Sequence, residues 1–459
     1  MSDVPMTRPN EVLAIHHTPY QHSSTFVQLD SGRILQCVFG GGFIHSDDGG
    51  LTWSKLTGKD FSDDAGNQFW HQCSDTDGNP VGGGDCALVK LSGKHSIGLS
   101  AVRVEKQPDA SYAVLDKTHG LWFWRSDDEG RTWQPPVRMS APNVSSGTFV
   151  DTFLRTASGR IIRPAVFMLG GATGMADLPQ PMTGKLVNNQ WISTAGHFFD
   201  YNFMCVYMLF SDDDGRTWKR NQDGMITYAQ DWNDHFSKLT ESSVTEVSPG
   251  KLVVFMRTGL GRLFQAWSSD NGTTWSRAMP TALAASAAPA QLRTLPNGHL
   301  LCVWNQESAE EIARGENRTR ISSAISRDGG RVWEFFQNVH SGLEGTRVEP
   351  GPIRPARPAE VYMPSGQPAP VRDARYVVDS PVRWRGSYPA VLVLKDRVLV
   401  AHTSMSFEEH ATEATLVHPK RVAGASNQLL KVLPLTWFYG GKQPADNPFL
   451  PRAYDPAKP

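Results

Sequence analysis

An eight-residue motif that recurs five times constrains the fold of this 459-residue chain more than any other feature. It reads Ser-x-Asp-x-Gly-x-Thr-Trp, and only the last copy departs from it, with Val332 in place of Thr. Each copy predicts a hairpin turn, because the Asp carboxylate can accept turn N–H bonds, the Gly permits a positive φ and the Trp packs beside the next strand. The octets are SDDGGLTW from Ser46, SDDEGRTW from Ser126, SDDDGRTW from Ser211, SSDNGTTW from Ser268 and SRDGGRVW from Ser326.

A second repeat, a strand followed by a tight turn and another strand, occurs six times. Five of the six copies precede an octet, which closes a further hairpin. Four strands per unit, repeated six times, predict an all-β chain: a six-bladed β-propeller with four-stranded antiparallel blades. The copies are HSSTFVQLDSGRILQCVF from His22, DCALVKLSGKHSIGLS from Asp85, DTFLRTASGRIIRPAVF from Asp151, ESSVTEVSPGKLVVFM from Glu241, PAQLRTLPNGHLLCVW from Pro289 and YPAVLVLKDRVLVAH from Tyr388.

The repeats show no domain boundary, so we expect one propeller over residues 12–440 and a C-terminal tail over 441–459. Long insertions fall at 66–84, 170–203 and 342–381. Loops of such length in a compact domain commonly serve binding or act as lids.

Charge and composition exclude several partners. The formal net charge is -1, and nucleic acid or an anionic membrane would favour a clustered excess of Lys and Arg. The N-terminal sequence as it stands has no secretory pattern, and no apolar run is long enough to span a bilayer, so we expect a cytoplasmic protein. Five scattered cysteines lack metal-ligand spacing. We therefore expect no zinc site, and the sequence implies no metal and no cofactor, although whether carboxylate-rich loops bind calcium stays open.

The residue that opens each strand repeat should face one shared funnel, because the first strand of each propeller blade lines the central channel. Five of these six residues can transfer protons or donate hydrogen bonds. The alternative for each is a strand-end cap or a polar surface residue. The candidate catalytic residues are therefore His22, Asp85, Asp151, Glu241 and Tyr388.

Two arginines are candidates for binding a substrate anion. Arg257 ends the strand that follows Glu241, and Arg318 precedes the last octet, with Arg320 as its competitor. A guanidinium fork suits a carboxylate, whereas the alternative is a surface salt bridge. A hairpin that turns near Pro249 would make Glu241 and Arg257 neighbours across the ladder.

Octets and strands together resemble the sialidase-like superfamily of glycoside hydrolases, whose Asp-boxes match the octets. The resemblance also rests on ESSVTEVSPGKLVVFMRTG, LLCVWNQ, NRTRISSAISRDGGRVW and GSYPAVLVL. It implies a six-bladed propeller in which three arginines hold the substrate carboxylate, a tyrosine assisted by a glutamate is the nucleophile, and an aspartate is the acid and base. By motif position, Glu241 corresponds to the assisting glutamate, and Arg257 and Arg318 to the second and third arginines. The octet aspartates are then structural: Asp48, Asp128, Asp213, Asp270 and Asp328.

The sequence departs from the family pattern in three places. His22 stands where sialidases have the first arginine, and Gly386 stands where they have the nucleophilic tyrosine, with Tyr388 two positions on. The segment before the first octet, GGGFIHSDDGG, leaves almost no room for the loop that carries the acid/base aspartate.

Three functions remain open at this stage. The leading one is an exo-acting glycoside hydrolase for an acidic sugar such as a sialic acid-type residue, with Glu241 and Asp151 as base and acid and Tyr388 or His22 in support. A uronate lyase or another exo-glycosidase is the second, because Tyr, His and Arg also suit proton abstraction beside a neutralised carboxylate. The third is a carbohydrate-binding propeller without catalysis. A retaining, inverting or eliminative mechanism fits the sequence equally.

Overall fold

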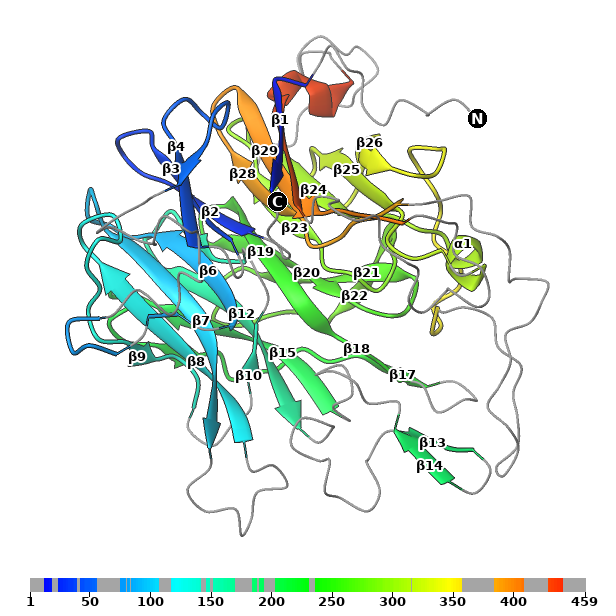
Figure 1. Cartoon of the computed structure of the whole chain (residues 1–459). Coiled ribbons are helices and arrows are strands. Elements are labelled where there is room, and N and C mark those ends of the chain that lie inside the picture. Colours follow the sequence, from blue (N-terminus) through cyan, green and yellow to red (C-terminus); the bar gives the residue numbers. More distant parts are fainter. Residues whose placement is uncertain are drawn as a thin grey trace.

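The structure is a computed structural model. It describes residues 12–18, 24–38, 42–55, 75–79, 81–82, 84–106, 117–141, 146–148, 152–169, 184–187, 190–193, 203–230, 236–314, 316–356, 384–407 and 428–440, without the side chains of some strand residues. Six antiparallel sheets surround a common centre (Figure 1), which confirms the predicted six-bladed propeller. The tail 441–459 lies outside the described residues, so the bounds 12–440 stay a prediction.

Four blades have the same order of four strands, which run outward from the centre in chain order. Blade 1 consists of β2 (Ser24–Gln28), β3 (Ile34–Val38), β4 (Gly42–Ser46) and β5 (Ser54–Lys55). Blade 2 consists of β6 (Gly84–Lys90), β7 (Ile97–Lys106), β8 (Lys117–Ser126) and β9 (Val137–Arg138). Blade 4 consists of β19 (Thr240–Ser248), β20 (Lys251–Arg257), β21 (Arg262–Ser268) and β22 (Met279–Ala284). Blade 5 consists of β23 (Gln291–Thr294), β24 (Leu300–Asn305), β25 (Arg320–Ser326) and β26 (Glu334–Ser341).

Blade 3 has an interrupted inner strand. Two short strands, β10 (Ser146–Gly147) and β11 (Leu154–Arg155), both pair with β12 (Ile161–Leu169). The sheet continues through β15 (Phe203–Ser211) and β16 (Lys219–Arg220). Together β10 and β11 occupy the place that one inner strand fills in the other blades.

Blade 6 is completed by the beginning of the chain. It contains β28 (Ala390–Val393), β29 (Arg397–Thr403) and β31 (Gln428–Pro434), and its outer strand is β1 (Ala14–Thr18). The sixth sequence repeat has no octet, because its third and fourth strands are not joined by a turn: the fourth strand, β1, comes from the beginning of the chain. Contacts between successive inner strands then close the ring from β28 to β2.

Short elements lie within the blades, between them or after the last strand. They are the hairpin of β13 (Gly184–Val187) and β14 (Gln190–Ser193), the pair β17 (Tyr228–Gln230) and β18 (Phe236–Lys238), the pair β27 (Trp384–Arg385) and β30 (Met405–Ser406), the helix α1 (Ala309–Ala313) and the 3-10 turn η4 (Leu435–Tyr439). Among the residues the structure describes, no helix is long and apolar enough to cross a membrane.

The octets form the predicted turns, and each joins the third strand of a blade to the fourth. In the second copy, Asp128 Oδ1 accepts from the Ser126 hydroxyl at 2.7 Å and from Thr132 N at 2.9 Å, while Oδ2 accepts from the Thr132 hydroxyl at 2.6 Å. Glu129 and Gly130 both have positive φ, 64° and 89°. The octet tryptophans pack into five different cores between blades: Trp53, Trp133, Trp218, Trp275 and Trp333.

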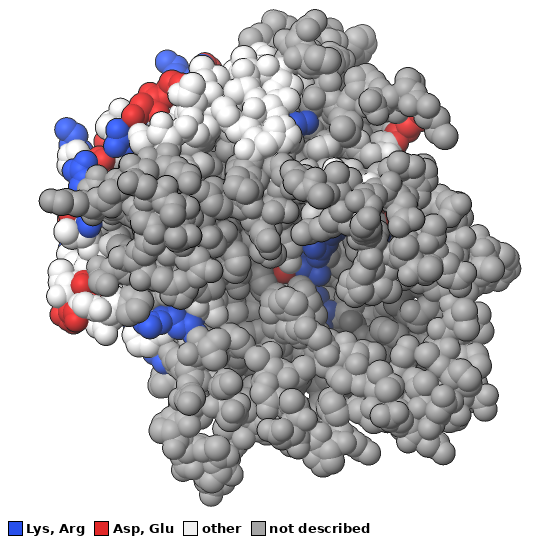
Figure 2. All heavy atoms as spheres, viewed as in Figure 1, with Lys and Arg blue, Asp and Glu red and all other residues white. Residues whose placement is uncertain are grey.

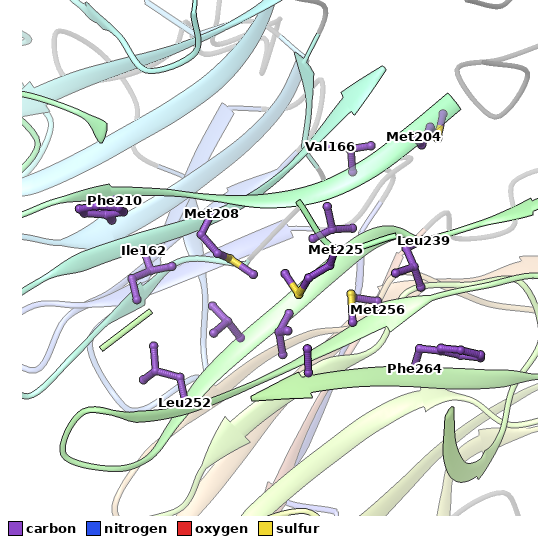
Figure 3. Close-up of a cluster of buried hydrophobic side chains, with 14 of the residues drawn as sticks. Ile162, Val166, Met204, Met208, Phe210, Met225, Leu239, Leu252, Met256 and Phe264 are labelled. Carbon is purple, nitrogen blue, oxygen red and sulfur yellow. The ribbon is translucent and has the colours of Figure 1, made fainter. Parts of the chain in front are cut away.

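One core between blades 3 and 4 lies beneath the candidate site. Figure 3 shows side chains of the two blades facing one another, with Ile162 and Met208 from blade 3 and Leu252 and Met256 from blade 4. All four are fully buried, and apolar burial of this kind is the main stabilising contribution in a fold without long helices. Tyr388, from the start of blade 6, packs against the same core.

Candidate functional site

Glu241 lies at a bulge in the innermost strand of blade 4. Thr240 pairs with Arg257 and Ser242 pairs with Met256, so Glu241 is the extra residue between two ladder positions. Its φ is 29°, a region that residues other than glycine rarely occupy. A bulge turns one side chain away from the regular alternation of a strand, and bulges are enriched beside active sites. Glu241 is therefore left without a partner in the β-ladder, and its carboxylate points away from the regular alternation of the strand.

The carboxylate is fully buried and forms an ion pair with Arg257. Arg257 Nη1 lies 2.5 Å from Glu241 Oε2, and the two side chains are 9% and 0% exposed. Burial alone would lower the pKa of Arg257, but the neighbouring Glu241 and Tyr388 raise it above its usual value. The prediction that Glu241 and Arg257 lie next to each other across the hairpin is confirmed.

Tyr388 completes the hydrogen bonding of the same carboxylate. Its hydroxyl donates to Glu241 Oε1 at 3.1 Å, so each carboxylate oxygen has a partner from a different part of the chain. The pKa of Tyr388 is raised, first by burial and then by the charge of Glu241, while Arg257 and Arg318 act in the opposite direction. Tyr388 has φ 54°. It is a weakly acidic hydroxyl with a proton acceptor already in contact.

Arg318 lies over the ring of Tyr388. Its guanidinium carbon is 5.2 Å from the ring centroid, within cation–π range. One nitrogen, Nη2, donates to Ala287 O at 3.3 Å, and Nε is buried without a hydrogen-bond partner in the described part of the chain. With φ 58°, Arg318 is also held in the left-handed region. This guanidinium keeps donor capacity for a ligand.

The structure separates Arg318 from its competitor. Arg320 is buried at the start of β25, and its Nη2 lies 2.9 Å from Glu311 Oε1. The same nitrogen also donates to the carbonyl of Glu344 at 2.9 Å. Arg320 is therefore a structural cation, whereas Arg318 contacts the tyrosine of the site.

Four of the seven residues proposed from the sequence are thus brought together: Glu241, Arg257, Arg318 and Tyr388. His22 and Asp151 lie outside the described residues. Asp85 lies in β6, where the pairing shifts register between Gly84 and Ala87, as it does at Glu241 in blade 4. The side chain of Asp85 is not among those described, so its role stays a prediction.

Gly386, where the family pattern has its tyrosine, has no room for a side chain. A Cβ at Gly386 would lie 2.5 Å from the Trp384 ring and 2.6 Å from Thr403 O, so no side chain fits there. Sequence reasoning also missed Asn305 and Thr403, which hold this segment. Asn305 lies in the segment LLCVWNQ, which carries part of the family resemblance, but the sequence assigned it no role, and Thr403 lies in no quoted motif. Only the folded backbone shows their contacts with Gly386 and Ser387.

Glu241 lies at the beginning of β19 and Arg257 ends β20. Tyr388 and Arg318 lie just before β28 and β25. Figure 2 shows a hollow near the middle of one face of the molecule, in which atoms of Lys or Arg and of Asp or Glu are visible. The described side chains supply a buried carboxylate, a phenol in contact with it and two guanidinium groups. This arrangement can bind an anion beside a nucleophile and its base.

Fold and site together define a six-bladed β-propeller with a Tyr–Glu–Arg centre. A family model for BNR repeat-like domains matches residues 113–400, more than half of the chain. The protein therefore belongs to the BNR repeat-like family, within the sialidase-like superfamily of six-bladed propellers.

Individual relatives are distant. A protein named sialidase from Bacteroides fragilis is 23% identical over 336 residues, which are 67% of this chain and 50% of that protein. The chain thus spans half the length of this curated relative.

Solved structures agree on the fold. A Hadza microbial sialidase matches with a TM-score of 0.51 and 16% identity, over 92% of this chain and 67% of its own. A protein of unknown function from Dyadobacter fermentans gives 0.50 and 16%, over 94% and 100%. The NanB sialidase from Streptococcus pneumoniae gives 0.50 and 12%, over 92% and 69%. At these identities the likeness shows the fold alone.

Proposed function

We propose that this protein is an exo-acting, retaining glycosidase for an acidic sugar of the sialic acid type, with Tyr388 as nucleophile and Glu241 as its base. One observation carries the proposal: the Tyr388 hydroxyl donates to Glu241 Oε1 at 3.1 Å beside two arginines. The name of the curated relative, a sialidase, supports the class of substrate.

In the first step, Tyr388 Oη bonds to the anomeric carbon and its proton passes to Glu241 Oε1. The glycosidic bond breaks, and the leaving oxygen takes a proton from an acid of the site. Asp151, Asp85 and His22 remain the candidates for that acid. In the second step, water gives a proton to the conjugate base of that acid and bonds to the anomeric carbon, and the phenolate leaves and recovers its proton from Glu241. Two displacements retain the anomeric configuration.

The arginines supply the anion site. Arg318 has donor capacity beside Tyr388, and the Arg257 fork is shared between Glu241 and the space around Tyr388. A substrate with a carboxylate on or beside the reacting carbon would repel a carboxylate nucleophile, whereas a phenol is neutral before attack. The pairing of a tyrosine with arginines therefore favours a carboxylated sugar over a neutral one.

A product assay tests the proposal. The purified protein is incubated with aryl sialosides, other ulosonic acid glycosides and uronate oligosaccharides, and products are followed by proton NMR. We expect release of the free sugar, first in the anomeric configuration of the substrate. An inverted first product contradicts the double displacement, an unsaturated uronate identifies a lyase, and binding without any product identifies a carbohydrate-binding propeller.

A further inference from the structure

The segment that leads to Tyr388 has no regular secondary structure, yet the second strand of blade 6 holds it firmly. The Thr403 hydroxyl accepts from Ser387 N at 2.8 Å and donates to Ser387 O at 3.0 Å. Thr403 N donates to the same carbonyl at 2.8 Å. Thr403 is 5% exposed. One buried side chain thus satisfies both backbone groups of the residue before the tyrosine.

Blade 5 holds the other side of the segment. Asn305 is fully buried, and its Nδ2 donates to Gly386 O at 2.8 Å and to Arg320 O at 3.1 Å. Gly386 N donates to Arg318 O at 2.9 Å. The backbone that carries Arg318 is therefore bonded directly to the backbone that carries Tyr388.

These contacts hold a backbone that would not adopt its conformation alone. Tyr388 and Arg318 both have positive φ, 54° and 58°, and such conformations are unfavourable for these residues unless the surroundings enforce them. The absence of a side chain at Gly386 lets the segment approach Thr403 O and the Trp384 ring. The strain is local, while the groups that enforce it come from blades 5 and 6.

We propose that Thr403 and Asn305 are positioning residues that clamp the Gly386–Tyr388 backbone and thereby hold the Tyr388 hydroxyl against Glu241 and its ring under Arg318. This inference rests on the proposed function, because it assigns the two residues to the geometry of the nucleophile. Neither contacts the reacting atoms in this arrangement; both act through Tyr388. A misplacement of about 1 Å in a reacting group can lower a rate about a hundredfold.

The test compares variants that remove or keep the bonding groups. Thr403→Val keeps the shape and removes the hydroxyl, and Thr403→Ser restores the hydroxyl. Asn305→Asp keeps the volume and removes both N–H donors, so it tests the clamp independently if Thr403→Val does not fold. We expect Thr403→Val to lower kcat about tenfold to a hundredfold with KM within about twofold of wild type, and Thr403→Ser to recover most of kcat.

Thr245→Val is the matched control. Thr245 is also a buried threonine, but its hydroxyl bonds to Thr294 along the inner strands of blades 4 and 5. This variant should match Thr403→Val in thermal stability while keeping wild-type kcat. If Thr403→Val and Asn305→Asp fold and keep wild-type kcat in an active enzyme, the clamp is overturned while the proposed function stands.

A second readout does not need turnover. The alkaline absorbance titration of the protein minus that of Tyr388→Phe isolates Tyr388, which should titrate above the usual tyrosine range. In Thr403→Val, we expect this titration to shift toward that of free tyrosine. If the wild-type protein cleaves no glycoside but the shift occurs, the proposed function fails and the clamp stands; an unchanged titration overturns the clamp.

Discussion

The octet turns and the candidate site both contain residues with positive φ and acidic side chains that accept hydrogen bonds, but these features serve different roles in the two regions. Seven described residues other than glycine have positive φ; three lie in octets, at Glu129, Asp214 and Asn271, and three in the site, at Glu241, Arg318 and Tyr388. In both regions, acidic side chains accept several hydrogen bonds. The difference lies in where the partners come from.

In an octet, the partners of the acid are local. Asp128 binds residues no more than four positions away, and the other octets repeat the pattern. The partners of Glu241 are 16 and 147 residues away. Hydrogen bonds between nearby residues need only the octet itself, whereas hydrogen bonds between distant residues require the whole ring of blades to be folded. We therefore expect changes in octets to affect stability and changes in the site to affect chemistry.

The largest effect is expected from Tyr388→Phe. It removes the nucleophilic oxygen and little volume, so kcat on a verified substrate should fall on the order of a thousandfold or more. Thermal melting should stay close to wild type, because the ring keeps its place against the core between blades 3 and 4. A variant that keeps a tenth of wild-type kcat would show that another group attacks the sugar.

Glu241→Gln should have the next largest effect. The amide cannot take the proton from Tyr388, so kcat should fall about a hundredfold with a modest change in KM. Glu246→Gln is the matched control, because Glu246 lies on the same strand and accepts from Gly250 N and Ala157 N, away from Tyr388. Wild-type turnover in Glu241→Gln, measured on the same substrate, would refute the assigned base.

The response to acid should distinguish the two regions by pH. Burial lowers the pKa of His402, which contacts Trp384 ahead of Tyr388, to about 3. Between that value and 6.5 the unfolded chain binds the additional proton, so the free energy of unfolding should fall as pH falls, by about 1.4 kcal/mol per pH unit for this imidazole.

Octet aspartates should respond only in stronger acid. Burial would raise the pKa of Asp48, but hydrogen bonds centred on Thr52 lower it to about 2. Its contribution to stability is present above the ordinary pKa of 3.8 and is lost as pH falls toward 2.

The measurement for His402 is thermal melting of the wild type and His402→Gln between pH 7 and 4, a range set by the ordinary pKa values of histidine and aspartate. An equal pH slope in both proteins would contradict the assignment to His402.

The smallest effect is expected from an octet. Asp128→Ala removes the acceptor for three hydrogen bonds and should cost about 1 kcal/mol of unfolding free energy, with kcat unchanged. Denaturant unfolding and steady-state kinetics on one preparation decide the outcome. A variant that is fully stable but inactive would contradict the claim that the octets contribute to stability and the site to catalysis.

The same distinction explains what the sequence could predict. The octets and the strand repeats are local patterns, so they predicted the turns and the six blades. The pair of Glu241 and Arg257 was also predictable, because one hairpin brings them together. The closure of blade 6 by β1 was not, since nothing in the strand Ala14–Thr18 identifies a partner more than 400 residues away.

The position of the proposed nucleophile also could not be predicted from the sequence alone. Position in a motif pointed to Gly386, whereas the backbone path, bent at Tyr388 and held by Thr403 and Asn305, decides which side chain reaches Glu241. Contacts of this kind join backbone groups to single side chains, and they leave no periodicity or spacing in the sequence.

The central claim is that Tyr388 attacks the sugar, and covalent trapping tests it most directly. The protein is treated with a 3-fluorosialyl fluoride, digested, and mapped by tandem mass spectrometry, with Tyr388→Phe treated in parallel. We predict a fluorosialyl adduct on Tyr388 in the wild-type protein and none in the variant. An adduct on another residue, or an enzyme that turns over sialosides while Tyr388 stays unlabelled, would contradict the account.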